Sequence, residues 1–84
     1  MEEKIITSTI REQIYNILRK RIYDGYYESG TKLIDQEVCD EFHVSRSPVR
    51  EAFRLLQAEG LLVGTSNRSL YVRSYSKKDV SNIY

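Results

Sequence analysis

The sequence contains a single cysteine, a single proline, a single histidine and no tryptophan among its 84 residues. Because one cysteine cannot close an internal disulfide, a reducing, cytoplasmic compartment is favoured. No apolar run approaches the ~18 residues that a membrane-spanning helix needs. The opening residues, Met1 to Lys4, are too acidic for a secretory signal peptide. These absences predict one small cytoplasmic domain with a modest core and no contact with a membrane.

The residues that catalysis and metal binding require are equally scarce. One histidine and one cysteine cannot provide the ligand set of a zinc site, and no glycine-rich phosphate-binding motif is present. His43 falls in a predicted turn, and Cys39 falls on the inward face of a predicted helix, where burial is the better explanation for a thiol. We therefore expect no enzyme activity, no metal and no cofactor in this domain.

Charge is nearly balanced over the whole chain but is unevenly distributed along it. The formal net charge is only +1. Residues 43–73 carry five basic and two acidic side chains, a net of +3, whereas residues 1–42 carry six basic and nine acidic ones, a net of −3. A local positive charge on a balanced domain is typical of a binding face for a polyanion.

The stretch from Ser45 to about residue 58 combines this charge with a helical pattern. Ser45 is a suitable N-cap whose hydroxyl can accept a backbone N–H, Pro48 falls in the first turn, and Gly60 is a suitable stop. Apolar residues recur on one face, namely Val49, Ala52, Phe53 and Leu56. Arginines recur every four residues on another face, namely Arg46, Arg50 and Arg54. The pattern predicts a DNA recognition helix, although arginines on a helix more often form a solvated face.

The residues before this helix predict two further helices and a short strand. Thr9 and Glu12 have the spacing of a capping box, and apolar residues at helical spacing continue to Asp24, namely Ile10, Ile14, Ile17, Leu18 and Ile22. A short strand is predicted over residues 31–34. A second helix is predicted from an Asp35 cap to about Phe42, with Val38, Cys39 and Phe42 facing inward. Two short helices joined by a brief turn form a helix-turn-helix.

The residues after the recognition helix predict a β-hairpin. Residues 61–63 and 70–73 read as strands around a polar tip that contains Ser66, Asn67 and Arg68. Such a hairpin is a wing, and the cation at its tip can enter a minor groove. Three helices with a two- to three-stranded antiparallel sheet predict a mainly helical winged helix-turn-helix. We assign residues 9–73 to this domain, residues 1–8 to an N-terminal arm, and residues 74–84 to a linker and the start of a helix that leads to an absent C-terminal domain.

From Ile10 to Val72 the chain resembles the N-terminal domain of GntR-family bacterial transcription regulators. The most specific match is the run from Val44 to Ala52, VSRSPVREA. Within that family the chain is most similar to the FadR-like branch, which implies an all-helical effector domain that binds a small carboxylate and drives dimerisation. The resemblance places neither ligand nor metal in these 84 residues.

The resemblance also implies which residues contact DNA. Arg46 and Arg50 would read bases in the major groove, with guanine O6 and N7 as natural partners. Ser45 and Ser47 would hold phosphate, Arg54 would contact phosphate only, and the tip residues Ser66, Asn67 and Arg68 would lie near the minor groove. The chain departs from the family pattern at several positions, among them Gln36 and Asn67. Gln36 replaces an arginine that some relatives carry, so no DNA contact is assigned to it, and Asn67 stands in for the usual wing glycine.

The predicted function is sequence-specific binding of double-stranded DNA by one half of a homodimer on a palindromic operator, in the cytoplasm at the nucleoid. A winged helix that binds an acidic protein instead of DNA is the alternative from another functional class. RNA binding is a weaker alternative, because the chain lacks an aromatic stacking platform.

Overall fold

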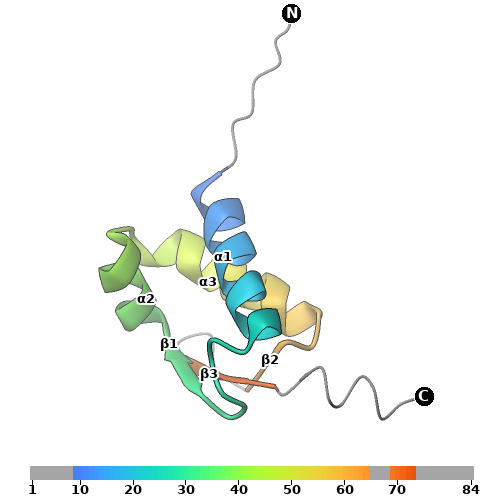
Figure 1. Cartoon of the computed structure of the whole chain (residues 1–84). Coiled ribbons are helices and arrows are strands. Elements are labelled where there is room, and N and C mark those ends of the chain that lie inside the picture. The colour runs from blue at the N-terminus through green and yellow to red at the C-terminus, as the bar shows by residue number, and fades with distance from the viewer. Residues whose placement is uncertain (1–8, 65–68, 74–84) are drawn as a thin grey trace, which may run out of the picture.

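The computed structural model describes residues 9–64 and 69–73. Its three helices stand on one side of a three-stranded antiparallel sheet (Figure 1). The elements in chain order are α1 (Ile10–Asp24), β1 (Lys32–Ile34), α2 (Asp35–Phe42), α3 (Arg46–Ala58), β2 (Leu62–Val63) and β3 (Ser69–Val72). The predicted winged-helix fold is confirmed. The predicted arm at residues 1–8 and the predicted linker and helix start at residues 74–84 lie outside the described residues.

Helix α1 begins and ends where its local sequence predicts. The Thr9 hydroxyl accepts the Glu12 backbone N–H at 3.1 Å, and the Glu12 carboxylate accepts the Thr9 N–H at 3.1 Å. This reciprocal pair is the predicted capping box. Gly25 ends the helix with φ of 81°, a left-handed conformation that glycine adopts without a steric penalty. Both ends of α1 are therefore set by short-range signals.

The core lies between α1, α3 and the inner face of the sheet. Its fully or nearly buried members come from every element: Ile14, Leu18, Ile22, Leu33, Val38, Cys39, Val49, Ala52, Phe53, Leu56, Leu61, Leu62, Leu70 and Val72. Two residues of the predicted apolar face of α1 are outside it, because Ile10 is 51% and Ile17 is 37% exposed. The buried residues of α1 recur strictly every four residues. They form a narrower apolar stripe than the one predicted from the sequence.

The first turn of α2 differs from the prediction. Ile34 occupies the N-cap position and makes no side-chain capping bond, and Asp35 is already the first helical residue. Asp35 is buried, because its carboxylate turns toward α3 instead of back to the α2 backbone. At the other end of α2, His43 adopts φ of 57° and is the one non-glycine residue with positive φ in the described ranges. The turn from His43 to Ser45 completes the helix-turn-helix.

The sheet fixes where α2 starts. Strand β3 lies in the centre, with β1 and β2 antiparallel on its two sides. Leu33 pairs with Leu70 and Leu62 pairs with Val72, all facing the core. Each strand differs by one residue, at one end or at both, from the predicted bounds at residues 31–34, 61–63 and 70–73. Because β1 runs directly into α2, this pairing anchors the first turn of α2 beside α3.

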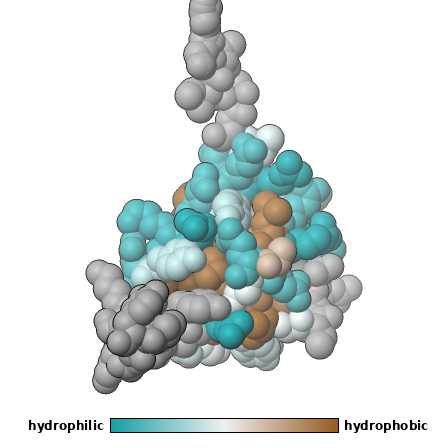
Figure 2. Space-filling model, turned by 90° about the vertical axis from the view of Figure 1, so that its right-hand side faces the viewer, coloured by the Kyte–Doolittle hydropathy of each residue, from teal (hydrophilic) through white to brown (hydrophobic). Residues whose placement is uncertain are grey.

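Apolar side chains also reach the surface in places. Figure 2 shows one face of the molecule, on which hydrophilic side chains predominate and apolar ones form patches between them. Across the hairpin, Val63 pairs with Tyr71, and these two outward-facing side chains are 42% and 43% exposed. Leu55 on α3 is likewise 43% exposed. Apolar surface of this extent is normal for a small domain.

Candidate nucleic-acid interface

Helix α3 presents two opposite faces, as its sequence predicts. Its inner face is fully buried and comprises Val49, Ala52, Phe53 and Leu56. Ser45 occupies the N-cap with an extended backbone, but its side chain makes no capping hydrogen bond. The position predicted for Ser45 is therefore confirmed, and the predicted hydroxyl bond is wrong. Glu59 caps the other end, and Gly60 follows with φ of 81°.

The start of α3 is suited to an anion. Helix α1 has Glu12 in its first turn, and α2 has Asp35 and Glu37 there, whereas the first turn of α3 has no acidic residue. The positive end of the α3 dipole is thus not compensated from within its own first turn. Ser45 and Ser47 are exposed at this end. Backbone N–H groups and hydroxyls at a helix N-terminus are ready donors for phosphate oxygens.

An open groove runs between the starts of α1 and α3. It is lined by Thr9, Ile10, Arg11, Ser45, Ser47, Pro48 and Glu51. Arg11 donates to Glu51 across the groove, with 3.1 Å between Nη1 and Oε1. Both side chains are about half exposed, so this pair contributes at most about 1 kcal/mol. It nevertheless ties the N-terminal turn of α1 to α3 beside the two serines.

Arg46 is exposed, and its guanidinium is hydrogen-bonded to α2. Its Nε donates to Gln36 Oε1 at 2.9 Å, and its Nη2 donates to the same oxygen. Gln36 in turn donates from Nε2 to Asp40 Oδ1 at 2.9 Å. Hydrogen bonds to Gln36, which is itself bonded to Asp40, therefore hold the Nε and Nη2 edge of the Arg46 guanidinium.

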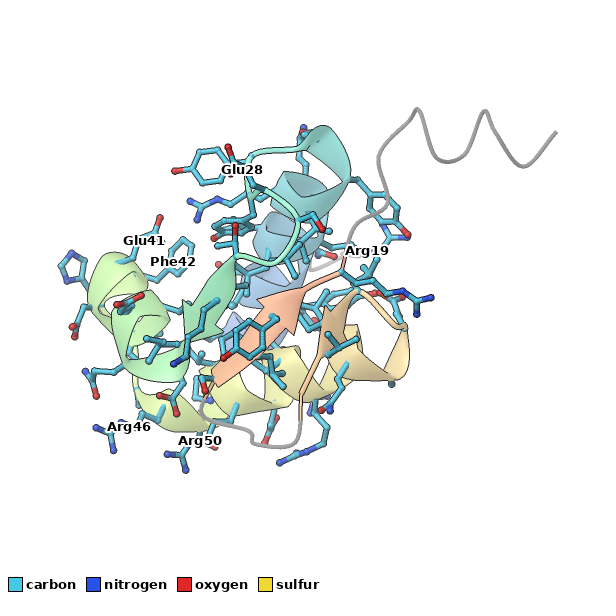
Figure 3. The ribbon with its side chains drawn as sticks, turned by 90° about the horizontal axis from the view of Figure 1, so that it is seen from below. Arg19, Glu28, Glu41, Phe42, Arg46 and Arg50 are labelled. Carbon is cyan, nitrogen blue, oxygen red and sulfur yellow. The ribbon has the colours of Figure 1, made fainter. Side chains whose placement is uncertain are left out.

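Arg50 is held from the same turn of α2. Its Nε lies 2.8 Å from Asp35 Oδ2, and the Asp35 side chain is only 7% exposed, whereas that of Arg50 is 35% exposed. Figure 3 shows Arg46 and Arg50 side by side, both projecting outward from the start of α3. These two predicted base readers are therefore brought together on one outer surface.

The remaining predicted site residues lie further away or are not described. Arg54 is exposed on the next turn of α3 and lines a small cleft with Arg11, Glu51 and Leu55. Ser66, Asn67 and Arg68, and the positive φ predicted for Asn67, fall outside the described residues. The predictions for Ser45, Arg46, Ser47, Arg50 and Arg54 as DNA contacts remain predictions, although the structure places all five on the exposed side of α3.

Two residues beside the arginines were not singled out from the sequence. The sequence predicts Asp35 as a cap and assigns no contact to Gln36, yet each accepts a hydrogen bond from one arginine of α3. The one available signal was the resemblance, which implies an arginine at position 36 in some relatives.

Arg21 braces the other end of α2. Its guanidinium donates to both oxygens of Glu41, at 3.2 and 2.7 Å, and to the Tyr27 hydroxyl at 2.9 Å. It also lies over the Tyr26 and Phe42 rings, 4.8 and 5.3 Å from their centroids. The hydrogen bonds that Arg21 donates to Glu41 raise the pKa of Arg21 above its ordinary value. This cluster joins the end of α2 to α1 and to the turn that follows α1.

The described residues offer little to other chemistries. Within residues 9–64 and 69–73, no group of three or more His, Cys, Asp or Glu side chains could hold a metal ion. In the same ranges, no helix has the length and apolar character needed to cross a membrane. Cys39 is 4% exposed, and burial raises the pKa of its thiol, as for a structural cysteine.

A helix-turn-helix followed by a hairpin, with arginines and a helix N-terminus free of acidic residues on one exposed surface, defines a winged-helix DNA-binding domain of the kind that transcription regulators carry.

Comparisons with known proteins agree with this class. Residues 10–72 match the family of bacterial regulatory proteins called the gntR family. The chain is 40% identical over 72 residues to the HTH-type transcriptional regulator YdhC of Bacillus subtilis strain 168, covering 86% of this chain and 32% of that protein. It is 42% identical over 76 residues to the HTH-type transcriptional repressor RspR of Escherichia coli K12, covering 90% of this chain and 33% of that protein.

A crystal structure of a GntR-family transcriptional regulator from Pseudomonas syringae pv. tomato DC3000 superposes with a TM-score of 0.73 at 40% identity, covering 86% of this chain and 30% of that one. The chain belongs to the GntR family of bacterial transcription regulators and is its winged-helix DNA-binding domain. It spans about a third of the length of the curated relatives that it matches.

Proposed function

We propose that α3 lies in the major groove of duplex DNA and that Arg46 and Arg50 read guanine there. The observation that carries this proposal is the placement of the two guanidinium groups one helical turn apart on the outer side of α3, opposite its buried face. An arginine fork fits guanine O6 and N7 with two parallel hydrogen bonds. Each arginine is held through its Nε, so that Nη1 and the outer side of Nη2 face away from α2.

The residues around these two arginines hold the sugar-phosphate backbone in this proposal. Ser45 and Ser47 bind phosphate at the uncompensated start of α3, and Arg54 binds phosphate one turn further along. The hairpin tip with Ser66, Asn67 and Arg68 lies near the minor groove, where its single cation follows the backbone. Contacts of these two kinds fix the register of the helix without specifying sequence themselves.

The complete regulator is proposed to be a homodimer on a palindromic operator, because two copies of a small reading helix double the number of bases read. A longer protein is supported by the length of the relatives, of which this chain spans a third. We place it in the FadR-like branch, with a C-terminal effector domain that takes a small-molecule ligand. The winged helix itself is proposed to need no cofactor or metal, to catalyse no reaction, and to work in the cytoplasm.

The test is selection from a random duplex library with the chain dimerised through a fused coiled coil, followed by a salt titration on the selected duplex. We expect a palindromic site with guanines in each half, and an affinity that falls steeply with salt. Failure to enrich any sequence would contradict the proposal and favour a winged helix that binds an acidic protein. Enrichment of single-stranded RNA in a parallel selection would favour RNA binding.

A further inference from the structure

Two consecutive residues at the start of α2 hold the two arginines that lie one turn apart on α3. Asp35 Oδ2 accepts a hydrogen bond from Nε of Arg50 at 2.8 Å, and Gln36 Oε1 accepts one from Nε of Arg46 at 2.9 Å. Neighbouring residues on a helix point about 100° apart, yet here both meet the same face of α3. This follows because the turn from His43 to Ser45 folds α3 across the first turn of α2.

The orientation of the Gln36 amide is fixed by its partners. Its oxygen faces two N–H groups of Arg46, and its nitrogen faces the Asp40 carboxylate at 2.9 Å. The flipped amide would place N–H groups against a guanidinium and an oxygen against a carboxylate, so it would lose every one of these bonds. The Gln36 amide therefore has one possible orientation, in which it accepts hydrogen bonds from Arg46 and donates one to Asp40.

This contact leaves one edge of Arg46 available. A guanidinium has five N–H donors in a rigid fork, and Gln36 uses the edge formed by Nε and Nη2. The outer edge formed by Nη1 and Nη2 remains for a bidentate partner such as guanine. Because the amide is neutral, it orients the arginine without cancelling the positive charge that approaches the DNA.

We propose that Gln36 is a positioning residue that determines specificity by presenting the outer edge of Arg46 to one base pair of each half-site. The inference rests on the proposed role of Arg46 as a base reader. Holding a long side chain in its bound conformation beforehand removes part of the entropy cost of binding. Gln36 is exposed, so it can be replaced without disturbing the core, unlike the buried Asp35.

The experiment compares variants of the dimerised chain on the selected duplex and on its single-base variants, by fluorescence anisotropy. In Gln36→Leu we expect the preference at the base pair read by Arg46 to fall about fivefold, with preferences elsewhere unchanged. Gln36→Glu keeps the acceptor and should retain that preference, while its added negative charge weakens binding to every duplex. Asn16→Leu makes the same exchange of amide for leucine on the exposed surface of α1 and should change neither quantity.

A double variant separates positioning from direct contact. If Gln36 acts through Arg46, then Gln36→Leu has no further effect on base preference once Arg46→Ala is present. An equal loss in both backgrounds would show that Gln36 reads the base itself and would overturn the proposal. So would an unchanged preference in Gln36→Leu.

The base preference of the single variant Arg46→Ala separates failure of the proposed function from failure of positioning by Gln36. If Arg46→Ala abolishes the preference but Gln36→Leu does not alter it, positioning by Gln36 is refuted and the proposed function stands. If Arg46→Ala also leaves the preference intact, the assignment of Arg46 as a reader fails, and positioning by Gln36 fails with it. Equal thermal midpoints in all variants confirm that each is folded.

Discussion

Removing Arg50 should weaken the fold as well as the recognition of DNA, because its guanidinium is the partner of a buried carboxylate. In Arg50→Ala the Asp35 side chain, 7% exposed, loses the bond that its Oδ2 receives at 2.8 Å. A polar group left buried without its partner bears its full desolvation penalty. The variant should therefore be less stable even in the absence of DNA.

The expected size lies between two limits. An exposed ion pair contributes at most about 1 kcal/mol, whereas breaking a fully buried pair costs about 3–5 kcal/mol. Arg50 is 35% exposed and Asp35 is almost fully buried, so the pair lies between these cases. We expect Arg50→Ala to lower the free energy of unfolding by about 2 kcal/mol, which in a domain of this size lowers the thermal midpoint by roughly 10 °C.

The assay is thermal and urea unfolding followed by circular dichroism. Arg54→Ala is the matched control, because this arginine is exposed on the same helix, and its loss should change stability by no more than about 0.5 kcal/mol. Adding Asp35→Asn to Arg50→Ala removes the stranded charge and should restore about 1 kcal/mol. An Arg50→Ala variant as stable as the control, or no recovery with Asp35→Asn, would refute the reasoning.

Three further predictions concern local features. Thr9→Ala removes the capping box of α1 and should destabilise the domain by about 1 kcal/mol in urea unfolding, whereas Thr9→Ser should not. His43→Gly relieves a left-handed residue with φ of 57° and should raise stability by about 0.5 kcal/mol, since the steric gain exceeds the cost of the conformational entropy that glycine adds to the unfolded chain; a lower midpoint would contradict this. Burial raises the pKa of the Cys39 thiol above its ordinary value, so less thiolate forms at pH 8. At pH 8 the Cys39 thiol should be alkylated about tenfold more slowly in the folded protein than in denaturant, and equal rates would show an accessible thiol.

The parts of the fold that were predictable from sequence are those fixed by neighbouring residues. The capping box at Thr9, the stop at Gly60 and the helical spacing of the buried positions on α3 each depend on residues within a few turns of one another. Periodicity alone therefore separated the core face of α3 from the face that bears Arg46 and Arg50.

The parts that were missed depend on how two helices cross. Asp35 has the sequence position of a cap, but a buried bond to Arg50 replaces that role once α3 lies across α2. The contact between Gln36 and Arg46 likewise joins residues ten apart, which no helical period brings together. Ser45 occupies its predicted position without its predicted bond, so the pattern located the residue correctly but assigned its hydroxyl wrongly.

The most direct test of the account is a crystal structure of the dimerised chain bound to its selected duplex. The account predicts α3 in the major groove, with Nη1 and Nη2 of Arg46 and of Arg50 within about 3 Å of guanine O6 and N7. It also predicts that Gln36 and Asp35 keep their bonds to Nε. Arginines bound only to phosphates, or α3 lying outside the groove, would contradict it.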